Sequence, residues 1–188
     1  MRITGGDLGG RAYYFPPGIK ERPTSDFLRE TIFNLLGPVE KTIFIDLFAG
    51  SGGVGLEAAS RGARQVYLVE KNKKLADIIK KNLRSLSLET KCFVIAADVK
   101  IGLKELAQEK CRADFVFADP PYNRGLVATT LNCLGKYKAL SEESIIVIQH
   151  SINEKYIEFL PDNIYQVQQR KYGENALTFF KRSGNDTG

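Results

Sequence analysis

The chain has 188 residues, 43% of them hydrophobic, with 27 Lys and Arg against 22 Asp and Glu. This length fits one domain of ordinary size, and the hydrophobic content excludes a disordered chain. No apolar run approaches the roughly 18 residues of a membrane span, and the first residues lack the apolar core of a signal peptide, so we expect a cytoplasmic protein. The net charge of +5 fits a polyanionic partner but is a weak signal alone.

The N-terminal segment, residues 1–22, is glycine-rich and basic, and contains Tyr13-Tyr14-Phe15 followed by Pro16-Pro17-Gly18. This composition predicts a short β-hairpin arm and then a loop. At the other end, the polar residues 183–188 predict a disordered tail.

A helix is expected after Pro23, with Thr24 or Ser25 as its N-cap, and Gly37-Pro38 ends it. Four apolar residues fall on one face of this helix: Leu28, Ile32, Leu35 and Leu36. Arg29 and Glu30 also fit a pair on the helix surface.

From residue 42 onward, short apolar runs alternate with helical patterns. The expected strands are 42–46, 65–69, 92–96, 114–118 and 144–148, and helical patterns cover 55–60 and 71–86. Near-continuous apolar strands that alternate with helices predict a parallel sheet covered on both faces. The runs 165–172 and 176–181 predict a C-terminal antiparallel hairpin at the sheet edge.

Acidic residues stand at the carboxyl ends of four of these strands: Asp46, Glu70, Asp98 and Asp119. Ligands of such sheets bind beyond the carboxyl ends of the strands, where the strand order reverses. This coincidence is the main sequence evidence for a ligand site.

The first of these loops, residues 46–55, is glycine-rich, so its backbone can approach a ligand closely. A carboxylate at Glu70 can accept hydrogen bonds from ribose hydroxyls, and one at Asp98 from an adenine amine. Residues 50–55 also satisfy the dinucleotide fingerprint G-x-G-x-x-G, which leaves NAD open. Asp46 argues against NAD, because its carboxylate would repel a pyrophosphate and suits the ammonium group of S-adenosylmethionine.

Asp119-Pro120-Pro121-Tyr122 follows the fourth expected strand. The prolines fix the backbone, so the directions of Asp119 and of the Pro120 carbonyl are fixed as well. A planar base can stack on Tyr122 and donate the hydrogens of its amino group to these two acceptors. The alternative is that Asp-Pro-Pro is simply a turn, but its place after the fourth strand favours a functional role.

These motifs resemble those of a known family. Asp119-Pro120-Pro121-Tyr122 matches the Asp/Asn-Pro-Pro-Tyr/Phe signature of amino-methyltransferases that act on adenine N6, cytosine N4 and guanine N2. Over nearly the whole chain, the sequence is similar to the RsmD family, the bacterial 16S rRNA (guanine-N2) methyltransferases. The similar stretches are 1–6, 9–11, 22–26, 29–34, 46–52 and 172–173. Gln149-His150 departs from a stretch that is often more apolar or acidic in the family, which leaves the far wall of the pocket open.

The resemblance implies an α/β, Rossmann-like class I methyltransferase fold with a mostly parallel seven-stranded sheet. It implies S-adenosylmethionine as methyl donor and N2 of one guanine as acceptor, in 16S rRNA that carries ribosomal proteins in the small subunit. Asp119, Pro120 and Tyr122 are the expected catalytic residues. The expected cofactor-binding residues are Asp46, Phe48, Ala49, Gly50, Ser51, Gly52, Glu70, Lys71, Asp98 and Val99.

RNA contacts are expected mainly from the arm, although its residues also fit a merely solvated hairpin. The expected substrate-binding residues are Arg2, Arg11, Arg22, Thr24 and Arg124, with Lys20 a further candidate. Tyr13 and Tyr14 can stack on bases. The lysines between residues 71 and 81 fit a solvated helix face better. We expect a monomer with an arm at 1–22, a methyltransferase domain at 23–182 and the tail at 183–188.

The expected reaction is a direct, in-line displacement on a base that has left its stack. An ordinary aspartate is a poor base, so no strong general base is assigned and the proton passes to Asp119 or to water. Three alternatives stay open: a DNA or RNA adenine-N6 or cytosine-N4 methyltransferase, an NAD-linked oxidoreductase, and a non-catalytic RNA-binding ribosome assembly factor.

The remaining reactive side chains offer little chemistry. Cys92, Cys111 and Cys133 have no metal-ligand spacing, and we interpret them as small buried apolar residues. A single histidine, His150, cannot make a His-rich zinc site, and a Ser-His-Asp triad would rest on it alone. The sequence therefore predicts no metal site.

Overall fold

The computed structural model describes residues 1–17 and 24–183. The chain divides into two compact units, Met1–Asp98 and Val99–Gly188. Arg22 and Lys20, and all of the predicted tail except Ser183, lie outside the described residues. Among the described residues, none of the helices is both long and apolar enough to span a membrane.

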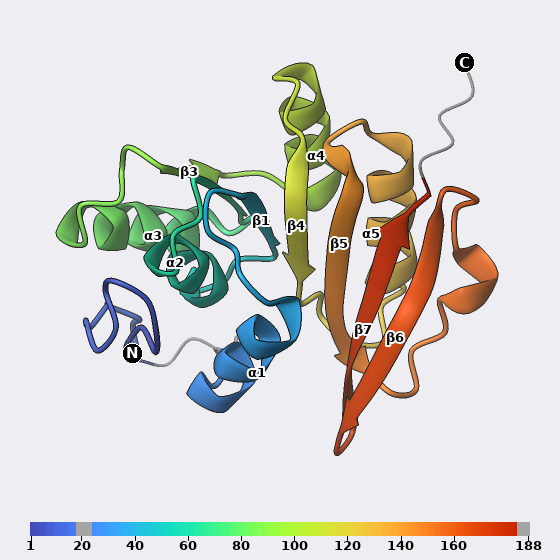
Figure 1. Ribbon diagram of the computed structural model, residues 1–188, viewed down its shortest axis with the longest axis horizontal. Helices are drawn as coiled ribbons and strands as arrows, with labels where there is room; N and C mark the ends of the chain where they lie inside the picture. The colour runs from blue at the N-terminus through green and yellow to red at the C-terminus, as the bar shows by residue number, and fades with distance from the viewer. Residues whose placement is uncertain (18–23, 184–188) are drawn as a thin grey trace. The chain divides into compact units, whose positions relative to one another are not determined.

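The first unit is built of alternating helices and parallel strands (Figure 1). Its elements are α1 (Asp26–Leu36), β1 (Ile43–Leu47), α2 (Gly53–Ser60), β2 (Gln65–Val69), α3 (Lys73–Ser85) and β3 (Cys92–Ile95). β2 lies between β1 and β3 and pairs parallel with both. The three carboxyl ends therefore lie along one edge, since Leu47 pairs with Val69 and Val69 with Ile95.

The second unit starts parallel and ends antiparallel. Its elements are α4 (Val99–Gln108), β4 (Ala113–Ala118), α5 (Leu126–Lys136), β5 (Leu140–Ser151), the 3-10 helix η1 (Ile157–Phe159), β6 (Ile164–Tyr172) and β7 (Asn175–Arg182). β4 and β5 pair parallel, and β7 pairs antiparallel with both β5 and β6, so these strands run side by side in Figure 1. The predicted C-terminal hairpin is confirmed.

The predicted fold class is confirmed, because the sheet has seven strands, mostly parallel, with antiparallel strands at the C-terminal end. Strand bounds differ from the expected ones by a few residues, most of all for β5, which begins at Leu140 rather than at Ser144. Helices α4 and α5 were not expected. The predicted arm hairpin is present in short form: an antiparallel bridge joins Arg2 and Ala12, and residues 1 and 3 accept from or donate to the backbone of residues 13 and 11.

The interpretation of α1 needs correction. Its buried residues are Arg29, Ile32, Phe33 and Leu36, whereas Leu28 and Leu35 are only partly covered. Arg29 is 0% exposed and is therefore no part of a surface pair. Buried ionised side chains are tolerated only when they are paired and hydrogen-bonded. We therefore expect Arg29 to contact acidic or carbonyl groups inside the protein rather than water.

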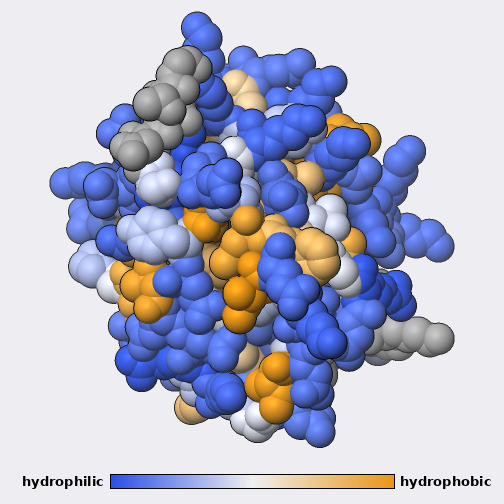
Figure 2. Space-filling view, turned by 90° about the vertical axis from the view of Figure 1, so that its right-hand side faces the viewer, coloured by the Kyte–Doolittle hydropathy of each residue, from blue (hydrophilic) through white to orange (hydrophobic). Residues whose placement is uncertain are grey.

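Figure 2 looks at the side of the second unit on which β6 and η1 lie, and shows apolar residues gathered among hydrophilic ones. The exposed large apolar side chains of these two elements are Ile157, Phe159, Tyr165 and Val167. This surface carries none of the predicted site residues.

Candidate active site

The loop between β1 and α2 is held in an unusual backbone conformation. Phe48, Gly50 and Gly52 all have positive φ, at 60°, 55° and 79°. Glycine adopts this region without steric cost, whereas Phe48 does so only because its surroundings force it, as is common at ligand sites. Gly55 is required for another reason: a Cβ there would lie 2.6 Å from Leu68 Cδ2.

Asp46 near the end of β1 is 2% exposed, and its Oδ2 accepts a hydrogen bond of 2.8 Å from the Gly55 N–H, in the first turn of α2. The N-terminus of a helix favours negative charge, so this position stabilises the carboxylate and fixes its direction.

Glu70, directly after β2, ties the same loop to its neighbouring strand. One carboxylate oxygen accepts from the Gly50 N–H at 2.8 Å and the other from the Asn72 N–H at 2.7 Å. Each oxygen keeps further acceptor capacity, because a carboxylate accepts about four hydrogen bonds. The fixed carboxylate beside a glycine loop fits the ribose of an adenosine-containing cofactor.

The other predicted cofactor residues have more varied positions. Ala49 and Ser51 are buried within the loop, and the Ala49 N–H donates to the Val69 carbonyl at 3.0 Å. Lys71 and Asp98 are exposed, and Val99 is the first residue of α4. The structure thus brings Asp46 and Glu70 onto the glycine loop, and places Asp98 shortly after β3 at the same edge.

A polar contact between the arm and the helices was missed by sequence reasoning. Glu57 of α2 is 0% exposed and accepts from the Thr4 N–H at 2.8 Å, the Gly5 N–H at 2.7 Å and Arg61 Nε at 2.9 Å. Arg29 donates to the Arg2 carbonyl and to Asp26, both at 2.7 Å. The one sequence signal for this network is the spacing of Asp26 and Arg29, which lie three positions apart and can pair on a helix.

The arm also reaches the glycine loop. Tyr13 is 4% exposed, and a Cβ added at Gly53 would lie 2.7 Å from its hydroxyl. Burial raises the pKa of Tyr13, so its hydroxyl stays protonated. The expectation that Tyr13 stacks on RNA is therefore wrong for this conformation, because its ring is covered by protein, whereas Tyr14 is 60% exposed.

In the second unit, Asp119 follows β4 directly and is partly exposed. Burial of its carboxylate raises the pKa of Asp119 to about 7. Within residues 1–17 and 24–183, no hydrogen-bond donor or cation is found for this carboxylate. A carboxylate with a pKa near the working pH suits general acid–base chemistry.

Tyr122 lies close to Asp119 and to the end of β5. Burial raises the pKa of Tyr122, and the charge of Asp119 raises it further, so the phenol stays neutral. Its hydroxyl accepts a hydrogen bond of 2.9 Å from Nε2 of Gln149. Asp119, Tyr122 and Gln149 thus form one cluster, of which Gln149 was not among the predicted site residues.

His150 belongs to a separate, structural network. Its Nε2 lies 2.7 Å from Thr178 Oγ1 and its Nδ1 2.7 Å from the Ser151 carbonyl, and Tyr156 packs edge-on against the ring. Burial lowers the pKa of His150. With both ring nitrogens engaged and 1% of its surface exposed, His150 is no candidate for catalysis.

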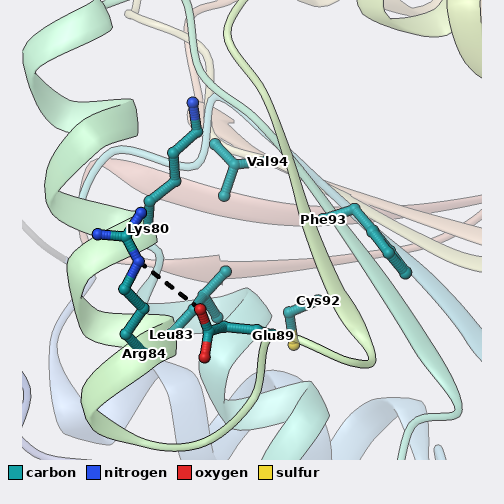
Figure 3. A pocket seen from close by; sticks show the side chains of 7 residues that line it. All are labelled: Lys80, Leu83, Arg84, Glu89, Cys92, Phe93 and Val94. Atoms are coloured by element: carbon teal, nitrogen blue, oxygen red, sulfur yellow. Dashed lines mark ion pairs between the residues drawn. The ribbon is translucent and has the colours of Figure 1, made fainter.

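Among the predicted RNA contacts, Arg2, Arg11 and Arg124 are exposed. Arg2 also lies 3.5 Å from Asp26, and Thr24 offers its carbonyl to Arg29 at 2.6 Å. A hollow of about 260 Å³ lies between the end of α3 and β3, and Figure 3 shows the side chains that line it. It is lined by Lys80, Leu83, Arg84, Glu89, Cys92, Phe93 and Val94, none of them a predicted site residue.

The seven-stranded sheet, with a glycine loop after β1 and acidic residues at the strand ends, defines a Rossmann-like methyltransferase fold. The solved structure of a putative methyltransferase, yhhF from Escherichia coli, matches with a TM-score of 0.84 and 31% identity, over 97% of this chain and 98% of that chain.

A family model described as Conserved hypothetical protein 95 matches residues 1–181, and the chain belongs to this family, the RsmD family. A putative rRNA methyltransferase, YlbH of Bacillus subtilis, is 32% identical and aligns with 98% of this chain and 100% of its own length. The ribosomal RNA small subunit methyltransferase D of Escherichia coli is 34% identical, over 97% of this chain and 90% of its own.

Proposed function

We propose that this protein transfers a methyl group from S-adenosylmethionine to the exocyclic N2 amine of one guanine in the 16S rRNA of the small ribosomal subunit. The observation that carries the proposal is the cluster after β4: a carboxylate without a protein partner among the described residues, beside a partly covered tyrosine ring. Two relatives with closely similar lengths carry names of rRNA methyltransferases, which supports RNA as the substrate.

The first unit supplies residues that fit the cofactor. Asp46 suits the ammonium group of its methionine part, Glu70 the ribose hydroxyls and Asp98 the adenine amine, with Gly50 and Gly52 leaving room for close approach. When bound, the cofactor supplies an electrophilic methyl group on sulfonium sulfur. The remaining expected contacts come from the backbone and side chains of Phe48, Ala49, Ser51, Lys71 and Val99.

The second unit holds the acceptor base. The base leaves its stack, its ring packs on Tyr122, and its amine donates to the Asp119 carboxylate and to the Pro120 carbonyl. Hydrogen bonds in these two directions leave the nitrogen lone pair pointing away from the ring plane, as attack on a methyl donor requires. Positioning of this kind contributes several kcal/mol to the rate.

The reaction releases one proton, and Asp119 is its acceptor. The amine nitrogen becomes positively charged when it takes the methyl group, and it returns to neutrality by losing a proton. We expected an ordinary aspartate to be too weak a base for this step. With its pKa raised to about 7, Asp119 is a much better acceptor, and it lies where the amine binds.

The RNA backbone is held by basic residues outside this cluster. Arg2, Arg11 and Arg124 are exposed and suited to phosphates, with Arg22 and Thr24 as further expected contacts. In this account the protein acts as a cytoplasmic monomer on rRNA within a small subunit or its assembly intermediate.

The test is a strain that lacks the gene for this protein. Primer extension along its 16S rRNA should show one guanine without the N2-methyl group, and the wild-type gene should restore the modification. Purified protein should then label that guanine in isolated small subunits from this strain. A methyl group lost from adenine N6 or cytosine N4 would favour the other amino-methyltransferase classes, and unchanged rRNA would contradict the proposal.

A further inference from the structure

Gln149 lies beside Asp119 across two adjacent strands, with Asp119 directly after β4 and Gln149 in the last part of β5. Ala118 of β4 is in register with Ile148 of β5, so the residues that follow them, Asp119 and Gln149, are neighbours across the strand pair. Adjacent strands lie about 4.8 Å apart, within reach of one base edge. Successive side chains of a strand alternate between faces, so Gln149 and His150 point to opposite sides of β5.

Only the nitrogen end of the Gln149 amide has a hydrogen-bond partner among the described residues. The side chain is 7% exposed, and its Nε2 donates to the Tyr122 hydroxyl at 2.9 Å. Its Oε1 is buried and has no hydrogen-bond partner in the part of the chain that the structure describes. A buried carbonyl oxygen without a donor is costly, and such atoms are rare in native proteins, where a functional role is one explanation for them.

In this structure the Tyr122 hydroxyl engages the nitrogen end of the amide. Because Nε2 is engaged by the hydroxyl, Oε1 is the end of the amide left without a partner among the described residues, and it only accepts hydrogen bonds. The cluster therefore offers a base two neighbouring acceptors, the Asp119 carboxylate and Gln149 Oε1.

Guanine is the base that matches two neighbouring acceptors. Its Watson–Crick edge presents the N2 amine next to the N1–H, both of them donors. Adenine and cytosine present an amine next to a bare ring nitrogen, which would face Gln149 Oε1 as acceptor against acceptor. A site with a buried hydrogen-bonding group strongly rejects a ligand that leaves this group unpaired.

We propose that Gln149 accepts the N1–H of the target base through Oε1 and so selects guanine over other bases that carry an exocyclic amine. This assignment rests on the proposed function, which it deepens by naming a specificity-determining residue. Tyr122 then has two roles, since its ring stacks on the base and its hydroxyl orients the amide that reads it.

The experiment compares guanine with 2-aminopurine at the methylated position of small subunits reassembled from rRNA that contains a synthetic segment. 2-Aminopurine keeps the amine that receives the methyl group but lacks the hydrogen on N1. 2-Aminopurine also lacks O6. This difference affects every enzyme variant equally, so it cancels when the ratio of kcat/KM for guanine to kcat/KM for 2-aminopurine is compared between variants.

The wild type should prefer guanine, and Gln149→Leu should lower that preference about tenfold to hundredfold, mainly through slower transfer to guanine. Gln149→Glu keeps an acceptor and should retain the preference, with Tyr122 now donating to the carboxylate. Gln168→Leu makes the same chemical change on the exposed strand β6 and should leave the ratio unchanged.

If Gln149→Leu lowered kcat/KM equally for guanine and for 2-aminopurine, the assignment would be overturned, because Gln149 would then act only by supporting Tyr122. Circular dichroism and the affinity for S-adenosylmethionine identify a variant that has failed to fold, and Gln149→Glu then carries the test. Failure of the proposed function looks different, since the wild type itself would then transfer no methyl group to guanine.

Discussion

Glu70, in the unit Met1–Asp98, accepts hydrogen bonds from two backbone N–H groups, whereas Asp119, in the unit Val99–Gly188, accepts none from the residues that the structure describes. Glu57 and Asp46 follow the pattern of Glu70, with fixed backbone donors. The difference matches the chemistry proposed for each carboxylate. A group that holds hydroxyls or an ammonium group benefits from a fixed direction, while a group that takes up a proton benefits from a raised pKa, which desolvation without a partner gives Asp119.

Loss of the unpaired carboxylate should have the largest effect. Asp119→Ala removes both the acceptor that orients the amine and the proton acceptor, so methyl transfer should fall by about 10²- to 10⁴-fold. Transfer of labelled methyl groups to small subunits measures the loss, and calorimetric titration should show nearly unchanged affinity for S-adenosylmethionine. Asp162→Ala, at an exposed position of the same unit, is the control. Substantial remaining activity in Asp119→Ala would reject the assigned role.

The paired charges of the first unit should matter for stability instead. Arg29→Ala leaves the fully buried Glu57 with one cation fewer and the Arg2 carbonyl without its donor, which should lower the free energy of unfolding by about 3–5 kcal/mol. Urea denaturation followed by circular dichroism measures the change. Arg64→Ala, an exposed substitution in the same unit, should change stability by no more than about 0.5 kcal/mol. Similar values for both variants would show that the arm is not held by this network.

A third change tests whether the two hydrogen bonds that Glu70 accepts contribute to cofactor affinity. Glu70→Gln replaces an oxygen acceptor by an amino group that faces a backbone N–H, so the affinity for S-adenosylmethionine should weaken about tenfold to hundredfold. The rate at saturating cofactor should change much less, because the base-binding cluster is intact. Glu40→Gln, at a side chain that is 70% exposed, is the matched control for the titration. An unchanged cofactor affinity would argue that Glu70 only supports the loop.

The smallest effect is a pH dependence. Asp119 accepts a proton only when ionised, and with a pKa of about 7 its ionised fraction rises between pH 6 and pH 8. The single-turnover rate at saturating cofactor should therefore increase about tenfold over this range and then level off. Asp119→Asn should be slow throughout and lose this dependence. A wild-type rate that is flat across the range would mean that Asp119 keeps the ordinary pKa of a carboxylate or is not the proton acceptor.

Most of the fold was predictable because parallel strands buried on both faces leave a continuous apolar pattern. β2, for example, has exactly the predicted bounds, Gln65–Val69. That the acidic residues at the strand ends share one edge of the sheet was predictable as well, since the carboxyl ends of parallel strands meet there. Helices α4 and α5 were missed because their helical signals are weak: Gly125, before α5, has no capping side chain, and Gly102 lies within α4.

The parts that escaped prediction all depend on contacts between distant segments. Arg29 and Glu57 are charged residues at positions that a helical pattern assigns to the surface, and only their contacts with residues 2–5 explain their burial. The raised pKa of Asp119 depends on how deeply its carboxylate is covered, which no motif encodes. Gln149 looked like a departure from the family pattern, and only its bond to Tyr122 connects it with the site.

The most direct measurement uses S-adenosylmethionine with a deuterated methyl group. Small subunits from the deletion strain are incubated with the protein, their 16S rRNA is digested to nucleosides, and the nucleosides are identified by mass spectrometry. The expected result is a single labelled product, N2-methylguanosine, which Asp119→Ala does not form. Label in N6-methyladenosine or N4-methylcytidine, or no label in any nucleoside, would contradict it.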